Sequence, residues 1–110
     1  MKLPSDAIIG MEKLTRYLLV PQSRGDKSAF LNRAGYGVQN AHELLRDLRE
    51  QLLPLDAVAL QSNQFGQYYE VRGRLTGPSG VVLLVRSIWM TEQRSGMTKF
   101  ITLVPDKEQA

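Results

Sequence analysis

Four side chains in the second half of the chain have the chemistry needed to contact a phosphate backbone. Arg72, Arg86 and Lys99 each interrupt a strand-like run of residues, and Tyr68 precedes Arg72 on the same run. Arginine and lysine bind phosphate, and an aromatic ring on a sheet face can stack on a base. The pattern therefore makes this basic, aromatic sheet surface the first candidate for a binding site.

Four further basic residues could contact an anion or a nucleic acid. Arg24 and Lys27 lie in the loop PQSRGDKS, which leads into a predicted helix, and a helix N-terminus can receive an anion. Arg74 shares a strand with Arg72, and Arg94 lies at the last predicted turn. The alternative, which stays open, is a solvated loop and a polar sheet face with cross-strand ion pairs.

Other kinds of site find little support in the composition. The chain has one histidine and no cysteine, which excludes disulfides, thiolate zinc sites and paired-histidine catalysis. The carboxylates are scattered, without the spacing of a calcium loop, and the serines lack a nucleophile-elbow motif. No metal and no cofactor are predicted, and His42 is interpreted as a surface residue.

The first half of the chain has helical periodicity, up to about residue 53. Apolar residues at helical spacing predict a first helix before Pro21 and a second helix that Asp26 caps and Gly35 ends. Asn40 and Glu43 have the spacing of an N-cap and its N3 carboxylate at the start of a third helix. The leucine stripe of this third helix is expected to face a core.

After residue 54 the apolar residues recur at every second position, which is the spacing of strands. The predicted strands are AVALQSN, QYYEVRGRLT, VVLLVRSIWM and MTKFITLV. Their short connections favour antiparallel neighbours. We predict an α+β fold in which two or three N-terminal helices pack on one face of a four-stranded antiparallel meander. Residues 1–110 would form a single domain, helical over about 6–53 and a sheet over about 55–105. The charged tail, 106–110, is expected to fray.

Register decides whether the basic residues meet. Arg86 interrupts the most apolar run, so it needs a carboxylate partner such as Glu70, or an opening to solvent. If Thr76 pairs with Val81, Arg72 does not lie opposite Arg86, whereas a one-residue bulge would put both arginines on one face. The sequence leaves both registers open.

Charge and hydropathy suit an intracellular domain with a polyanionic partner. Fourteen Lys and Arg residues against eleven Asp and Glu residues give a net charge of +3. The N-terminus lacks the continuous apolar run of a signal peptide, and no run reaches the roughly 18 apolar residues of a membrane span. We therefore expect a cytoplasmic location and no membrane contact.

Three stretches carry a resemblance to known proteins: KLTRYLLVP, DKSAFLNRAGY and the closing IWMT…SGMTKFITLVPD. In this order, over nearly the whole chain, they resemble an uncharacterised family of small bacterial proteins, a domain of unknown function. Helices followed by a meander that ends in a Trp … Phe-Ile-Thr … Pro strand are also similar in topology to the barnase/colicin-D/RelE-like ribonucleases of bacterial toxin systems.

The second resemblance implies RNA cleavage on the sheet face. RelE-like members without a catalytic histidine use Arg, Lys and Tyr for electrostatic stabilisation and proton transfer. By position, the catalytic role would fall to Arg72, Arg86, Lys99 and Tyr68, with Lys27 from the helical side. The chain has no His/Glu pair at a matching position, which excludes the arrangement of barnase itself.

Two functions follow as hypotheses. The first is an RNA-binding domain or toxin-type endoribonuclease. It predicts that the heads of Arg72, Arg86 and Lys99 converge in a concave surface, and heads that are splayed apart or each neutralised by a carboxylate would remove that mechanism. The second is a non-catalytic protein-interaction module, a partner or antitoxin-like component, which predicts an exposed apolar patch or sheet edges paired across a dimer. A cognate protein partner and a homodimer both stay open.

Overall fold

The computed structural model describes residues 1–107, in which helical segments come first and strands follow. The helical segments are α1 (Met11–Lys13) with its π-helical continuation η1 (Leu14–Leu18), α2 (Ser28–Asn32), the 3₁₀ turn η2 (Val38–Asn40), and α3 (Ala41–Asp47) with its π-helical continuation η3 (Leu48–Leu52). The strands are β1 (Val58–Asn63), β2 (Gly66–Thr76), β3 (Val82–Glu92) and β4 (Thr98–Pro105). They pair antiparallel in the order β1-β2-β3-β4.

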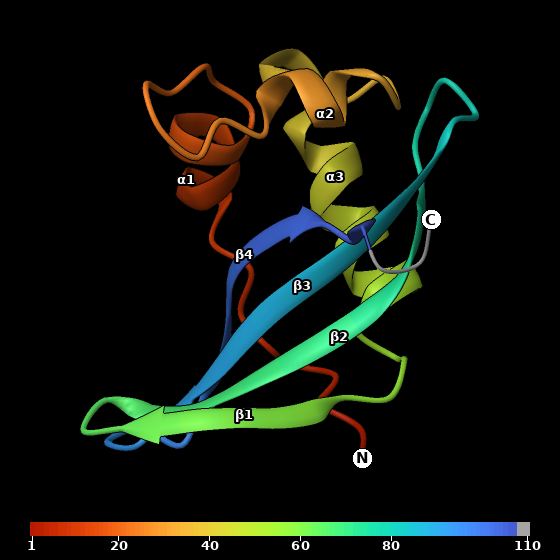
Figure 1. Cartoon of the computed structure of the whole chain (residues 1–110). Helices are drawn as coiled ribbons and strands as arrows, with labels where there is room; N and C mark the ends of the chain where they lie inside the picture. The colour runs from red at the N-terminus through yellow and green to blue at the C-terminus, as the bar shows by residue number, and fades with distance from the viewer. Residues whose placement is uncertain (108–110) are drawn as a thin grey trace.

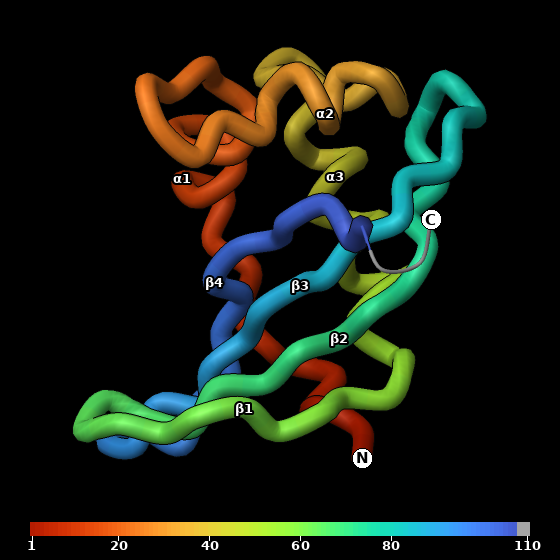
Figure 2. Tube along the Cα trace, in the orientation of Figure 1, coloured from red at the N-terminus to blue at the C-terminus, as the bar shows by residue number. Residues whose placement is uncertain are grey.

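The predicted α+β fold is confirmed. Figure 1 shows α3 behind the sheet and α1 with α2 gathered at one end of it, and the trace in Figure 2 shows the same arrangement. Leu44, Leu48 and Leu52 of the long helix are fully buried, and so are Val71 and Leu75 on the strand that the helix covers. The leucine stripe therefore builds the core, as its helical spacing predicts. Among residues 1–107, no helix is both long and apolar enough to cross a membrane.

The polar residues before two of the helices act differently from simple N-caps. Asp26 Oδ1 accepts hydrogen bonds from the backbone N–H of Ser28 (2.8 Å) and from its hydroxyl (2.7 Å), just ahead of α2. Asn40 accepts a hydrogen bond from the N–H of Gly37 (2.7 Å) and donates one to Glu43 (2.9 Å). Asn40 therefore closes the turn before α3 and also holds the predicted N3 carboxylate.

The N-terminal segment is extended and covers one edge of the sheet. The N–H of Ile8 donates to Thr98 (2.7 Å), and the N–H of Phe100 donates to Ile8 (2.8 Å). Ala7 and Ile9 are buried, and the first helix begins at Met11. The start of the segment lies elsewhere, since Lys2 pairs with Asp56 just before β1. Among the described residues, β1 itself pairs only with β2 and is the other edge strand of the sheet.

The turn between β2 and β3 sets the register of the two central strands. The N–H of Gly77 donates to Val81 (3.1 Å), which leaves a three-residue turn with Gly80 at φ 84°. A three-residue hairpin turn uses a residue in the left-handed region at this position, and glycine adopts it without strain. Thr76 therefore pairs with Val82 instead of Val81, without any bulge in this strand pair.

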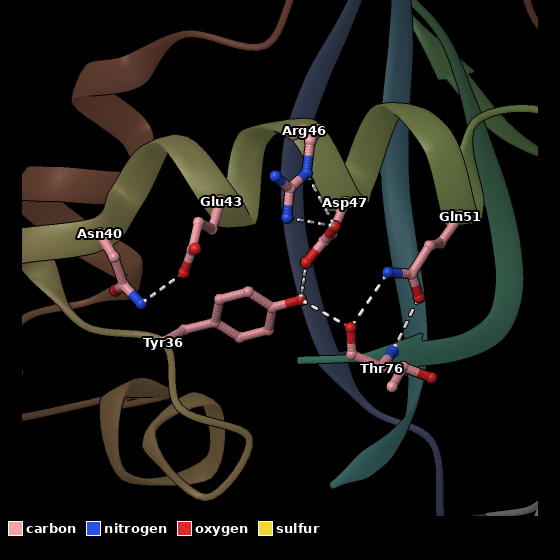
Figure 3. A network of polar contacts seen from close by, with 7 residues as sticks. All are labelled: Tyr36, Asn40, Glu43, Arg46, Asp47, Gln51 and Thr76. Atoms are coloured by element: carbon pink, nitrogen blue, oxygen red, sulfur yellow. Dashed lines mark hydrogen bonds and ion pairs between the residues drawn. The ribbon is translucent and has the colours of Figure 1, made fainter. Parts of the chain in front are cut away.

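A polar network, buried at Tyr36 and Asp47, attaches this hairpin to the helices (Figure 3). The Tyr36 hydroxyl donates to Asp47 Oδ2 (2.5 Å) and lies 3.3 Å from the carbonyl oxygen of Thr76. Gln51 holds the same Thr76 backbone with two hydrogen bonds, of 3.0 and 2.7 Å. Burial, and next the hydrogen bond to Asp47, raise the pKa of Tyr36 far above its ordinary value. The network therefore contributes most while the phenol keeps its proton.

Candidate functional site

Arg72 and Arg86 lie directly opposite each other on the two central strands. On β2, Val71 and Leu75 point into the core, so Arg72 points to the face that the helices leave open. On β3, Val85 is buried, as are Leu83, Ser87 and Trp89 of the same parity, and Arg86 points to the same open face. The register thus brings together the two arginines whose meeting the sequence left undecided.

Two carboxylates hold this pair of guanidinium groups. Arg86 donates to Glu70 Oε2 from Nε (2.8 Å) and again, at shorter range, from Nη2. Arg72 Nε lies 3.3 Å from Glu70 Oε1 and 3.3 Å from Asp106 Oδ2. The prediction that Arg86 needs a carboxylate such as Glu70 is confirmed. We call Glu70, Arg72, Arg86 and Asp106 the arginine cluster.

Acids and bases of the arginine cluster lie at different depths. The side chains of Glu70 and Asp106 are 10% and 0% exposed, whereas those of Arg72 and Arg86 are 39% and 36% exposed. Buried carboxylates need such partners, because an unpaired charge away from water is costly. The acids therefore form the floor, and the guanidinium groups lie above it facing solvent. Such a surface can bind an anion with donors that are already oriented.

Lys99 lies apart from the arginine cluster. It pairs with Met90, four residues along β3 from Arg86, which corresponds to about 13 Å along a strand. Its Nζ lies 2.9 Å from Glu92 Oε2, and this hydrogen bond is the main cause that lowers the pKa of Glu92. Tyr68 pairs with the same Met90 and shares the open face with Glu70, two residues along β2.

The four candidate anion contacts are dispersed. Arg74 lies opposite Leu84 on the open face, beside the arginine cluster. Arg94 is exposed in the turn between β3 and β4, and Arg24 is exposed in the loop before α2. Lys27 directly precedes α2, where the hydrogen bonds from Ser28 lower the pKa of Asp26. Of these residues, the structure places only Arg74 next to Arg72.

The predicted catalytic cations therefore do not form a single group without carboxylate partners. Arg72 and Arg86 share Glu70, and Lys99 has Glu92, so each of the three has a carboxylate. The predicted mechanism, in which Arg72, Arg86 and Lys99 converge and act together, is therefore removed. What remains is a narrower arrangement, in which Arg72 and Arg86 are anchored from below and act together.

Asp106 is the member of the cluster that the sequence did not indicate. It belongs to the tail expected to fray, yet it is 3% exposed, and its N–H donates to the carbonyl oxygen of Leu84 (2.8 Å). Residues 108–110 of that tail lie outside the described residues. His42 is exposed at the start of α3. Within residues 1–107, no three potential ligands from His, Cys, Asp and Glu gather in a metal-binding group.

Comparison with known proteins places the chain in a family. The model of a domain of unknown function, DUF6883, matches residues 2–107. The chain belongs to this family. No curated protein matches the DUF6883 chain. Its fold is similar to that of one chain in the contact-dependent growth inhibition toxin–immunity protein complex from Klebsiella pneumoniae 342. The two chains are 17% identical with a TM-score of 0.60, over 91% of this chain and 100% of the other.

Proposed function

We propose that this DUF6883 chain is a toxin-type endoribonuclease domain that binds the scissile phosphate on the arginine cluster. The observation that carries the proposal is the pair of guanidinium groups of Arg72 and Arg86, directly opposite each other and held by buried carboxylates. Two oriented guanidinium groups stabilise the charge that develops on a phosphate during transfer, since they need little reorganisation. Glu70 and Asp106 act as positioning residues in this arrangement.

The reaction that this surface supports is cleavage through the ribose 2′-hydroxyl. The bond from the 2′-oxygen to phosphorus forms while the bond from phosphorus to the 5′-oxygen breaks. The 2′ proton leaves to water, and the 5′-oxygen takes a proton from water. Arg72 and Arg86 stabilise the pentacovalent phosphorus that is present while these two bonds change. The products are a 2′,3′-cyclic phosphate and a 5′-hydroxyl.

The proposal has support from the similar fold. That neighbour is a chain of a complex whose name includes a growth inhibition toxin and an immunity protein. A toxin that cleaves RNA would act in the cytoplasm of its target cell, and it would need a cognate protein partner to protect its producer. The net charge of +3 is compatible with a polyanionic substrate.

The test is RNA cleavage by the purified chain and growth arrest on its induced expression. Wild type should degrade RNA to fragments with 2′,3′-cyclic phosphate ends and stop growth. Arg86→Ala should lose at least about a hundredfold in cleavage rate, the usual cost of one lost electrostatic donor. Arg16→Ala, an exposed arginine on η1, is the matched control and should keep the activity. Intact RNA and normal growth with wild type would refute the proposal.

A second function is favoured by the exposed edge of the sheet. On β1, Val58 is 62% exposed, and Phe65 in the following turn is 60% exposed. These side chains fit a non-catalytic component that adds a partner's strand to β1. Normal growth with wild type, together with a stable complex that Val58→Lys disrupts, would favour this function over the nuclease.

A further inference from the structure

The end of β4 opens a hollow next to the arginine cluster. β4 stops at Pro105, opposite Val85, so the first residues of β3 continue without a β4 neighbour. Helix α2 lies above this part of β3. The result is a hollow of about 280 Å³, which we call the α2–β3 hollow. The lining residues that matter below are Phe30, Arg33, Val82, Leu84, Pro105 and Lys107.

The hollow and the arginine cluster share a wall. Asp106, which lines the hollow, holds Arg72 through its carboxylate (3.3 Å) and Leu84 through its backbone N–H (2.8 Å). Leu84 is two residues from Arg86 on the same face of β3, about 7 Å along the strand. A group bound in the hollow would therefore lie beside an anion bound on Arg86.

The lining combines apolar surface with positive charge. Phe30 packs partly on the core, and Val82 is 48% exposed at the floor of the hollow. Arg33 and Lys107 are both exposed at the rim. The one acid in the lining, Asp106, is covered and already engaged by Arg72, so it does not oppose an anionic ligand. An aromatic ring beside two cations suits a flat base attached to a phosphate.

We infer that the α2–β3 hollow is a nucleobase subsite, which holds the base next to the phosphate on Arg72 and Arg86. The inference rests on the proposed function and makes it more specific: the substrate is an RNA strand with an unstacked base at the cleavage position. Phe30 supplies the stacking surface, Val82 and Leu84 form the floor, and Arg33 binds the neighbouring phosphate.

Nuclear magnetic resonance titrations of the full chain with small phosphates test the subsite. The probes are ribose 5-phosphate and the four ribonucleoside 5′-monophosphates. At least one monophosphate should bind about fivefold more tightly than ribose 5-phosphate, since base stacking on an aromatic side chain is worth at least that factor. It should also shift the amide signals of Leu84 and Lys107, which ribose 5-phosphate should leave nearly unchanged.

Two variants separate the subsite from general binding. Val82→Trp fills the hollow and should abolish the preference for the monophosphate, whereas Val38→Trp, at a similarly exposed valine on η2, should preserve it. Phe30→Leu keeps apolar volume without the aromatic face and should reduce the preference, which covers the case in which Val82→Trp unfolds the chain. Equal affinity for all probes, or no response at Leu84 and Lys107, would overturn the inference.

The same experiments distinguish this inference from the proposed nuclease. Base binding in the hollow of a chain that leaves RNA intact would refute the endoribonuclease and keep the subsite. RNA cleavage whose rate and base preference are unchanged in Val82→Trp would keep the endoribonuclease and refute the subsite.

Discussion

Glu70 determines what the two arginines can do. Its two carboxylate oxygens contact different guanidinium groups, Oε1 that of Arg72 and Oε2 that of Arg86. Because the glutamate is nearly covered, it limits the rotamers of both arginines and so lowers the entropy that each would lose on binding a phosphate. The buried carboxylate of Glu70 thus fixes the positions of both guanidinium groups.

Replacing this acid should show its role in stability. Glu70→Gln keeps the size of the side chain but removes the charge, and we expect it to lower the free energy of unfolding by about 1–3 kcal/mol. Glu92→Gln is the control and should change stability less, since the carboxylate of Glu92 in its ion pair with Lys99 is 31% exposed, against 10% for Glu70. Urea unfolding at neutral pH measures both. Equal effects of the two substitutions would contradict a special role for Glu70.

Tyr36 predicts a dependence on alkaline pH. Its pKa in the folded chain is raised from its ordinary value near 10, so below about pH 10 the phenol is protonated in both states and its full contribution is present. Above that pH the unfolded chain loses the proton while the folded chain keeps it. The free energy of unfolding should then fall by up to about 1.4 kcal/mol per pH unit from this residue.

The variant Tyr36→Phe isolates this effect from the other groups that titrate at high pH. At neutral pH it should be about 1–3 kcal/mol less stable, since Asp47 loses a buried donor. The difference from wild type should narrow above about pH 10. Denaturant unfolding between pH 7 and 11 measures it, and a constant difference over this range would refute the assignment.

The β2–β3 hairpin and the segment after α2 behave as one unit. The N–H of Ser79 donates to Ala34 (3.0 Å), and its hydroxyl donates to Arg33 (3.2 Å). Gly77 approaches so closely that a Cβ there would lie 2.2 Å from the carbonyl oxygen of Ala34. Since Arg33 also belongs to the rim of the α2–β3 hollow, this contact positions one side of the proposed subsite.

Adding one carbon at this contact should separate the hairpin from the helices. Gly77→Ala should cost about 2 kcal/mol, since a packed backbone has to move. Gly10→Ala is the control: the nearest atom to its added Cβ is 4.0 Å away, and we expect little change. Thermal unfolding compares the two variants. A melting temperature of Gly77→Ala equal to that of wild type would contradict the close contact.

The whole molecule is asymmetric, with its helices behind and at one end of the sheet and its other face open (Figure 1). The open face carries Arg72, Arg74 and Arg86 on adjacent strands, and the hollow adjoins it. A single RNA strand could therefore lie across β2 and β3 with a base towards α2. If RNA binds in this way, its affinity would depend on the arginines gathered on the open face more than on the small net charge of the chain.

Salt dependence tests this arrangement for the whole chain. The logarithm of RNA affinity should fall linearly with the logarithm of salt concentration, and Arg86→Ala should reduce the slope by about 0.7, the value for one phosphate contact of a single strand. Arg16→Ala should leave the slope unchanged. Fluorescence anisotropy with a non-cleavable 2′-deoxy oligonucleotide measures it. An identical slope in Arg86→Ala and wild type would mean that RNA does not contact the cluster.

The spacing of apolar residues along the chain was enough to predict the helices and strands of this fold. Helical spacing of apolar residues up to residue 53 and alternation after it predict the α+β arrangement, and strand ends differ from the prediction by one or two residues. The exception is the N-terminal segment, which is extended because it pairs with β4. That pairing joins residues about ninety positions apart, which no local pattern contains.

The sequence by itself determined which residue types could bind phosphate and which strands would carry them. Only the tertiary structure decided that Arg72 meets Arg86, because one residue in the β2–β3 turn changes the face of a whole strand. It also decided that Lys99 stays apart, and that Asp106 folds back under Arg72. Spacing along the chain shows which residues of one strand share a face. The site depends on how separate strands are aligned, because the alignment decides which of their residues meet.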